Sequence, residues 1–141
     1  MKGHDRLRNR LTVLGLTALM GASAQVSFAH HSLGGEFDTR KTLKLTGVVS
    51  HVDWANPHIY VNLAVTDASG KVSTWRLECV PVAMARKAGV SMKMLQGNGD
   101  RVTIDAYPAR DGTPQLGFLA KITYPDGHHF QFAQDTAAEG K

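Results

Sequence analysis

Residues 58–79 read HIYVNLAVTDASGKVSTWRLEC, and this stretch decides the fold. Apolar and polar residues alternate on both sides of Ala68-Ser69-Gly70, which is the pattern of two half-buried β-strands joined by a tight turn. A three-residue turn with glycine in the left-handed position pairs Asp67 with Lys71. The same register pairs Leu63 with Trp75, Val61 with Leu77, Ile59 with Cys79, Tyr60 with Glu78 and Asn62 with Arg76. Apolar residues then meet on one face, which is predicted to be the core and to include Trp75, whereas a slip of one residue would break every pair.

Strand patterns continue on both sides of this hairpin. We expect strands at 43–53, 101–107 and 115–124, a bulge or bend at Gly47, and a last strand after a turn at Pro125-Asp126-Gly127 that pairs Ile122 with Phe130. A short helix fits residues 81–88, and Ser91 can cap a further helical turn at 92–96. Three strands, a short helix and two or three more strands is the order of an OB-fold. The predicted fold is all-β with one short helix, a small OB-like Greek-key barrel, and a small β-sandwich is the alternative.

The first 29 residues have the three parts of a secretory signal peptide. Residues 1–10 are basic, residues 11–20 are apolar, and small residues precede two cleavage sites, after Ala29 and after Ala24. The apolar run is shorter than the roughly 20 residues that a membrane span needs. We therefore expect a periplasmic or secreted protein, cleaved after Ala29 or alternatively Ala24, with no stable membrane insertion afterwards. The predicted organisation is a signal peptide at 1–29, a lead-in at 30–41, a barrel domain at 42–132 and a flexible tail at 133–141.

The predicted mature domain is nearly neutral, because residues 30–141 hold twelve Lys and Arg against eleven Asp and Glu. Nucleic-acid binding, a common role of OB-folds, is disfavoured by this charge and by export. No Ser-His-Asp or Cys-His signature and no phosphate-binding loop is present, and we expect no enzymatic activity. Cys79 is the single cysteine, so no intramolecular disulfide can form. We expect its side chain to be a small buried hydrophobe.

Residues 53–58, DWANPH, connect the first two predicted strands. Asn56-Pro57 is a turn signal, and Trp54 is large and amphipathic. A purely structural interpretation is a β-turn in which Asn56 caps backbone groups and Trp54 closes the end of the barrel. The functional interpretation is a shallow ligand-binding site on the polar face of the second strand. Its predicted residues are Trp54, Asn56, His58, Tyr60 and Glu78, with His51 beside them.

Cleavage after Ala29 would leave His30-His31-Ser32 at the N-terminus. An N-terminal histidine offers an α-amine and an imidazole, two nitrogen donors that together chelate Cu(II). A tetragonal site needs further ligands, and His31 and His58 can supply them if the lead-in folds back along the barrel. Copper is therefore a candidate cofactor, held by His30, His31 and His58. The alternative interpretation of this terminus is a flexible polar segment.

Met84 and the Met92-Lys93-Met94 segment offer thioether groups, which select Cu(I). With His58 and Trp75, the methionine pair resembles in composition the small periplasmic OB-fold proteins of silver and copper efflux systems. Its position in the helical region departs from those proteins, and core packing is the interpretation that we prefer for these methionines. His128 and His129 are adjacent on a predicted strand and therefore face opposite ways, so we expect structural or surface histidines there.

Several motifs occur in one order along the chain: His30-His31-Ser32, Glu36-Phe37-Asp38, Gly47-Val48-Val49, Trp54-x-Asn56-Pro57-His58 and Gly99-Asp100-Arg101-Val102. In this set the chain resembles a family of small exported bacterial proteins classed as a domain of unknown function. The resemblance spans nearly all of the predicted mature chain. It implies an exported, β-rich domain and no known activity or catalytic residues. Gly or Ser is more usual in that family where this chain has Cys79, which argues against a catalytic role for the thiol.

The sequence therefore predicts an exported, periplasmic, non-enzymatic binding or accessory domain. Its partner is a protein or a small ligand of unknown identity. A copper-binding protein that uses the mature N-terminal histidine is the first alternative. A structural partner in an envelope complex, without a small ligand, is the second, and it would expose an apolar patch.

Overall fold

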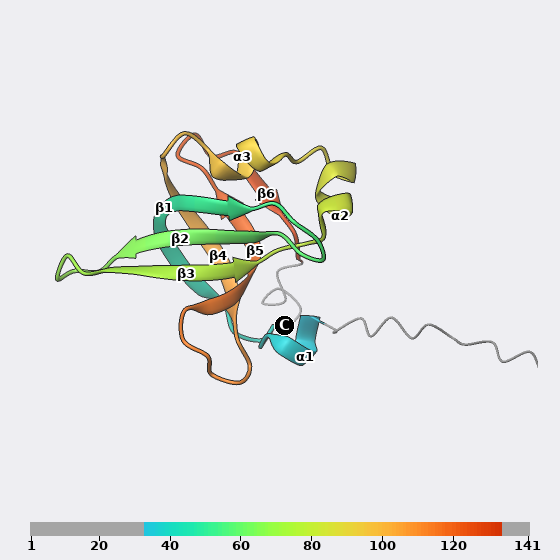
Figure 1. Cartoon of the computed structure of the whole chain (residues 1–141). Helices are drawn as coiled ribbons and strands as arrows, with labels where there is room; N and C mark the ends of the chain where they lie inside the picture. The colour runs from blue at the N-terminus through green and yellow to red at the C-terminus, as the bar shows by residue number, and fades with distance from the viewer. Residues whose placement is uncertain (1–32, 134–141) are drawn as a thin grey trace, which may run out of the picture. The chain divides into compact units, whose positions relative to one another are not determined.

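The computed structural model describes residues 33–133, which form a barrel of β-strands with three short helices (Figure 1). The strands are β1 (Leu43–Asp53), β2 (Tyr60–Thr66), β3 (Val72–Glu78), β4 (Arg101–Pro108), β5 (Leu116–Thr123) and β6 (His129–Gln131). The helices are α1 (Leu33–Glu36), α2 (Val82–Lys87) and α3 (Met92–Gln96). The predicted signal peptide, His30, His31 and nearly all of the predicted tail lie outside the described residues.

The strands follow the order β3-β2-β1-β4-β5-β6, and an additional pairing between β3 and β5 closes the barrel. That closing pair is parallel and sets residues 76–78 opposite residues 116–118, whereas all other strand pairs are antiparallel. Five strands in this order, with helices between the third and fourth, form an OB-like barrel. The prediction of a small OB-like barrel is therefore confirmed over the β-sandwich alternative. Within the described residues, no helix has the length and apolar character needed to cross a bilayer.

The β2–β3 hairpin has the predicted register. Leu63 lies opposite Trp75, Val61 opposite Leu77 and Tyr60 opposite Glu78. Ile59 and Cys79 extend the pairing, because the Cys79 N–H donates to the Ile59 carbonyl at 2.8 Å. Trp75 differs from expectation in being half-buried at the edge of the core rather than inside it. The reason is that β3 pairs with β5 only from Arg76 onward, so the half of the hairpin before Arg76 extends past the barrel (Figure 1).

The predicted bulge at Gly47 is wrong in position. The register of β1 shifts between Val49 and His51, at the point where the strand has left β4 and pairs only with β2. Gly47 itself lies where two strands approach closely: a Cβ on it would come within 2.2 Å of the Ala64 carbonyl oxygen. A second bulge in the β4–β5 pair places two consecutive residues of β5, Leu119 and Ala120, in the core. Both bulges increase the coiling of the sheet that barrel closure requires.

Three short helices are present where the sequence predicts one and a further turn. α2 and α3 occupy the predicted places, and the Ser91 hydroxyl caps α3 by accepting the Met94 N–H at 3.3 Å. The sequence carries no signal for α1, whose four residues include two glycines with low helix propensity. Its turn is fixed by the residue that follows, because Phe37 is buried and its N–H donates to the Leu33 carbonyl at 2.9 Å.

The core fills the barrel and continues under α2 and α3 through Val82, Ala85 and Leu95. Cys79 is fully buried in it, as predicted. Burial raises the pKa of the Cys79 thiol to about 12, so the nucleophilic thiolate is strongly disfavoured. The side chain therefore serves as a small apolar group in the core.

Candidate ligand-binding face

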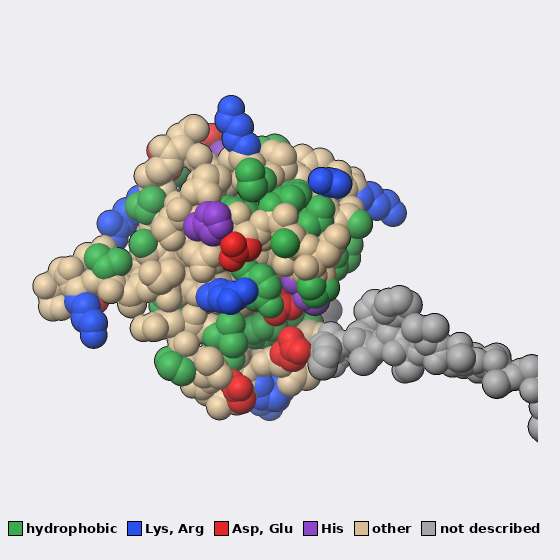
Figure 2. All heavy atoms as spheres, viewed as in Figure 1, with side chains coloured by type: hydrophobic (Ala, Val, Ile, Leu, Met, Phe, Trp, Pro, Cys, Tyr) green, Lys and Arg blue, Asp and Glu red, His purple; other side chains and the backbone are tan. Residues whose placement is uncertain are grey.

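The outer face of β1, β2 and β3 carries two rows of polar side chains. Strand pairing sets Asp53, Tyr60 and Glu78 side by side in one row, and His51, Asn62 and Arg76 side by side in the next. These residues face outward because their neighbours along each strand, such as Val61 and Leu77, point into the core. Figure 2 shows histidine, acidic and basic side chains gathered across the middle of this face. In OB-folds the face of strands 2 and 3, with the loops that flank it, is the usual ligand-binding surface.

The Glu78 carboxylate is the centre of this face. Its Oε2 accepts a hydrogen bond from the Tyr60 hydroxyl at 3.0 Å, and its Oε1 lies 3.0 Å from His58 Nδ1. The side chain of Glu78 is only 12% exposed, whereas that of His58 is 36% exposed. A hydrogen bond thus holds the Tyr60 hydroxyl on one oxygen of this half-buried carboxylate, and the His58 ring lies at ion-pair distance from the other oxygen. No hydrogen bond or ion pair joins His58 Nε2 to another described residue.

Arg76 and Tyr60 form a stacked pair beside Glu78. The Arg76 guanidinium carbon lies 4.1 Å from the centroid of the Tyr60 ring, a favourable cation–π distance. Burial and the neighbouring Glu78 carboxylate raise the pKa of the Tyr60 hydroxyl, so it stays protonated and continues to donate. The Tyr60 ring is thus held at its hydroxyl by Glu78 and covered by Arg76.

A second polar cluster lies on β1 and β2. The Asp53 carboxylate contacts His51 Nε2 at 2.9 Å and accepts a hydrogen bond from the Asn62 side-chain amide at 3.3 Å. All three side chains belong to the same face as Glu78, so the face presents both signs of charge within two adjoining clusters.

A cleft of about 480 Å³ opens beside Glu78 and Tyr60. Its walls come from three separate parts of the chain: the β2–β3 face, the α1 segment and the loop between β4 and β5. The lining residues outside the β2–β3 face include Glu36, Phe37, Arg110, Asp111 and Leu116. Arg110 ties two of these parts together, because its backbone N–H donates to the Glu36 carbonyl at 2.8 Å and its guanidinium donates to the Phe37 carbonyl at 3.4 Å. The volume is within the range of small-molecule sites.

The structure brings together three of the five predicted site residues, His58, Tyr60 and Glu78. Trp54 is half-buried against the core at the barrel end, which matches the structural interpretation of that residue. Asn56 is exposed, precedes a cis bond to Pro57, and shares no hydrogen bond with the Glu78 cluster. Sequence reasoning missed Arg76 as a member of the site, although its pairing beside Asn62 was predicted. It also missed Glu36, Arg110 and Asp111, which reach the cleft only through barrel closure.

A family model described as a family of unknown function (DUF6152) matches residues 18–118. The chain belongs to this family. The matched region includes every residue that lines the cleft and ends within β5, before β6. Comparison with curated proteins found no match, and comparison with solved structures found none either.

The metal ligands proposed for this DUF6152 domain are only partly described. His30 and His31 lie outside the described residues, and His58 is the one member whose position is known. Within residues 33–133, no group of three or more His, Cys, Asp or Glu side chains could hold a metal ion. The preferred core role for the methionines is wrong: Met84, Met92 and Met94 are all exposed on α2 and α3. The likeness to metal-efflux proteins is not supported by this placement, since Trp75 lies on β3 and the methionine pair on α3.

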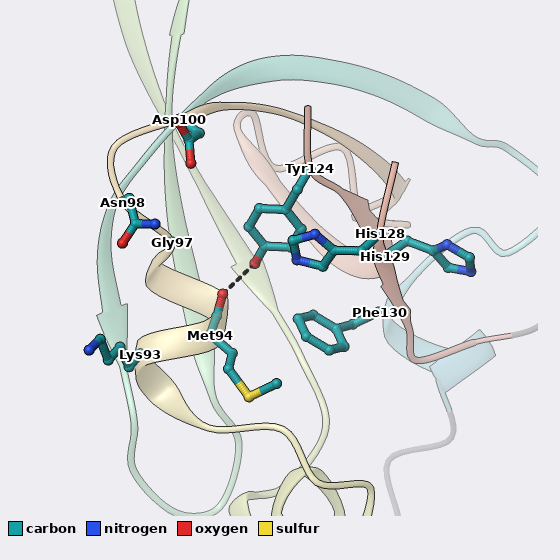
Figure 3. Close-up of a pocket in the computed structure, with 9 residues that line it drawn as sticks. All are labelled: Lys93, Met94, Gly97, Asn98, Asp100, Tyr124, His128, His129 and Phe130. Carbon is teal, nitrogen blue, oxygen red and sulfur yellow. Dashed lines mark hydrogen bonds between the residues drawn. The ribbon is translucent and has the colours of Figure 1, made fainter. Parts of the chain in front are cut away.

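A second cavity of the DUF6152 domain, about 440 Å³, lies between α3 and the β5–β6 hairpin (Figure 3). Aromatic rings form its wall: the His128 ring stacks on Tyr124 at 4.3 Å between centroids, and Phe130 stands nearly perpendicular to both. The Tyr124 hydroxyl donates to the Met94 carbonyl at 2.7 Å, and burial raises its pKa to about 12. Asp126 contacts the Nδ1 of His128. His128 is thus a structural histidine at the surface, and the exposed His129 also lines the cavity (Figure 3).

Proposed function

We propose that this DUF6152 chain is an exported, non-enzymatic binding domain of the periplasm. Its ligand site is the outer face of β1–β3 together with the adjoining cleft. The observation that carries the proposal is the Glu78 carboxylate, which is nearly buried and holds His58 and Tyr60 on that face. A carboxylate with a neighbouring side chain at each oxygen positions those side chains to contact a ligand.

The composition of the site favours recognition over chemistry. Tyr60 offers a ring face covered by Arg76, and the cleft adds the charged residues Arg110, Asp111 and Glu36 to its lining. Phe37 and Leu116 contribute apolar residues to the same lining. A mostly preformed cavity with a few convergent polar groups is typical of a small-ligand site. The occupant that suits it is a small polar molecule, or the polar side chains of a protein partner.

Fragment binding followed by two-dimensional NMR tests the site even while its natural ligand is unidentified. A library of small polar fragments is screened against the uniformly labelled protein. We expect amide shifts to cluster around Tyr60, Glu78 and Arg110. Tyr60→Ala should weaken the best fragment by about tenfold, which corresponds to the loss of one well-packed contact.

Thr103→Ala is the matched control, because Thr103 is a half-buried residue of β4 that is not among the residues lining the cleft. It should leave fragment affinity unchanged. Fragments that gather elsewhere on the domain, or that bind Tyr60→Ala as well as the parent, would contradict the proposed site.

Copper binding is the second candidate function, and the geometry of His58 favours it. A carboxylate oxygen 3.0 Å from Nδ1 leaves Nε2 as the free donor, which is the arrangement that carboxylates impose on metal-binding histidines. In addition, Gly35 and Glu36 of the α1 segment line the same cleft as Glu78, and His31 precedes Leu33 by two residues.

Cu(II) titration of the processed protein tests this candidate. Cu(II) should bind through the amine and imidazole of His30. His58→Gln should weaken Cu(II) binding by at least tenfold because it removes a nitrogen donor. One extra residue before His30 should weaken it as much because it separates the amine from the imidazole. Equal Cu(II) affinity in the parent and the extended variant would eliminate the copper proposal. It would leave the fragment-binding test of the cleft unaffected.

A further inference from the structure

The three methionines of the described region are all exposed, which is unusual for this residue type. The exposed fractions are 58% for Met84, 50% for Met92 and 44% for Met94. They make up three of the five large hydrophobic residues that are exposed between residues 33 and 133, the other two being Val48 and Val72. All three belong to α2 and α3, the two short helices between β3 and β4.

The same helices carry unpaired positive charge. Arg86, Lys87 and Lys93 are exposed, and none of them forms an ion pair with another described residue. Four other cations of the described residues do form ion pairs: Arg40 and Lys41 with Asp38, and Lys44 and Lys121 with Asp105. No Asp or Glu occurs between Glu78 and Asp100 in the sequence, so the segment has a net charge of +3.

The basic and the apolar side chains both occupy exposed positions of the two helices. Val82 and Ala85 of α2 and Leu95 of α3 pack into the core, which leaves the methionines and cations on the solvent side. Figure 1 places α2 and α3 at one end of the barrel, and Figure 2 shows basic and hydrophobic side chains intermixed over them. Lys93 and Met94 also line the aromatic cavity between α3 and the β5–β6 hairpin (Figure 3).

We propose that this surface, Met84, Arg86, Lys87, Met92, Lys93 and Met94, docks the domain reversibly on an anionic lipid bilayer. The cations would contact lipid phosphates, and the unbranched thioether side chains would enter the interfacial region between them. Short polar-apolar helices that lie on a bilayer bind through these two contributions together.

Charge favours an anionic lipid surface over a protein partner. Methionine and arginine are enriched in protein–protein interfaces, but lysine is depleted there, and tryptophan and tyrosine anchors supply many of the strongest contacts. Two of the three cations here are lysines, and no aromatic residue is among the large exposed hydrophobics of residues 33–133. This docking surface is separate from the cleft at Glu78 and does not depend on what the cleft binds.

Co-sedimentation with vesicles tests the proposal. The processed protein is mixed with vesicles of phosphatidylglycerol and phosphatidylethanolamine, or with phosphatidylcholine vesicles, and the same form of the protein is used for every variant. We expect binding to the anionic vesicles only, weakened by added salt. Lys93→Gln should weaken vesicle binding about fivefold, which is the usual contribution of one cation near an anionic bilayer. The triple variant Arg86→Gln, Lys87→Gln and Lys93→Gln should weaken it about a hundredfold, because three such contributions are lost.

Matched controls separate the surface from the total charge of the domain. Lys71→Gln removes an exposed lysine without an acidic partner from the β2–β3 turn, and Val72→Thr removes an exposed apolar residue beside it. Both should bind vesicles like the parent, whereas Met84→Gln, Met92→Gln and Met94→Gln together should abolish binding. These positions are exposed, and a thermal melt by circular dichroism confirms that each variant is folded.

Three results would overturn the proposal. The first is absence of binding to anionic vesicles at low salt. The second is an equal loss for Lys71→Gln and Lys93→Gln, which would indicate attraction by overall charge. The third is unchanged binding of the triple methionine variant together with competition by soluble polyglutamate, which would indicate a surface for acidic polypeptides instead.

Discussion

Two carboxylates of this domain that are largely shielded from solvent each have two partners. Glu78 has His58 and Tyr60, and Asp105 has the ammonium groups of Lys44 at 2.6 Å and Lys121 at 3.3 Å. Burial alone would raise the pKa of Asp105, but the hydrogen bonds from the two lysines outweigh it and lower the pKa. Half-satisfied buried charges are costly, so these pairs specify how the strands that carry them must align.

Asp38 should make stability depend on pH in the acid range. The hydrogen bond from Arg40, supported by the Arg40 N–H and by Lys41, lowers the pKa of Asp38 to about 2. Because the pKa is near 3.9 in the unfolded chain, the charged carboxylate stabilises the fold above that value, and the benefit disappears as the pH falls towards 2. Asp38→Asn should therefore be less stable than the parent at pH 7, with a difference that shrinks below about pH 4.

Urea unfolding at a series of pH values measures this difference. Asp100→Asn, at an exposed position, is the control and should differ little from the parent throughout. A gap between Asp38→Asn and the parent that stays constant from pH 7 to pH 3 would show that Asp38 acts through shape and not through its charge.

At the scale of elements, sequence patterns predicted the strands and turns that depend only on nearby residues. The β2–β3 hairpin was predictable to the residue, since alternation and the turn at Gly70 act within 22 residues. The position of the bulge in β1 was not predictable from sequence. The bulge arises where β1 stops pairing with β4 and pairs only with β2, and the sequence of β1 does not indicate where that change occurs. α1 was missed for the same reason: its turn depends on a tertiary contact of Phe37.

Gly47→Ala tests the close approach of β1 and β2. The added methyl group would lie 2.2 Å from the Ala64 carbonyl oxygen, so one strand must shift. We expect a loss of about 1–3 kcal/mol in the free energy of unfolding, the usual cost of overpacking a rigid site. Gly34→Ala is the control, because a Cβ there meets nothing within 4 Å. Equal stability of the two variants would show that the strand contact at Gly47 is not tight.

At the scale of the whole molecule, barrel closure creates the cleft. Its walls come from residues as far apart as Gly35 and Leu116: the β3–β5 pairing brings Glu78 beside Phe118, and the bridge between Phe37 and Ala109 brings the α1 segment to the β4–β5 loop. The sequence could predict that His58, Tyr60 and Glu78 are neighbours. Tyr60 and Glu78 are paired in one hairpin, and His58 lies two residues before Tyr60. The sequence could not predict Arg110 or Asp111, whose loop reaches the cleft through the fold as a whole.

Export is a prediction for the whole chain. Mass spectrometry of the protein recovered from the periplasm should show a mature form that begins at His30, or alternatively at Gln25. Both sites follow small residues at the spacing that signal peptidase requires. An intact chain that begins at Met1 and remains in the cytoplasm would contradict the proposed location.

The central claim is that Glu78 organises the binding face, and the tautomer of His58 tests it most directly. With a carboxylate oxygen 3.0 Å from Nδ1, the neutral ring should carry its proton on Nδ1 and present an unprotonated Nε2 to the ligand. Long-range proton–nitrogen correlation spectra of the neutral ring distinguish the two tautomers. We predict the Nδ1–H form in the parent and its loss in Glu78→Gln. A parent protein with His58 mainly in the Nε2–H form would contradict the account.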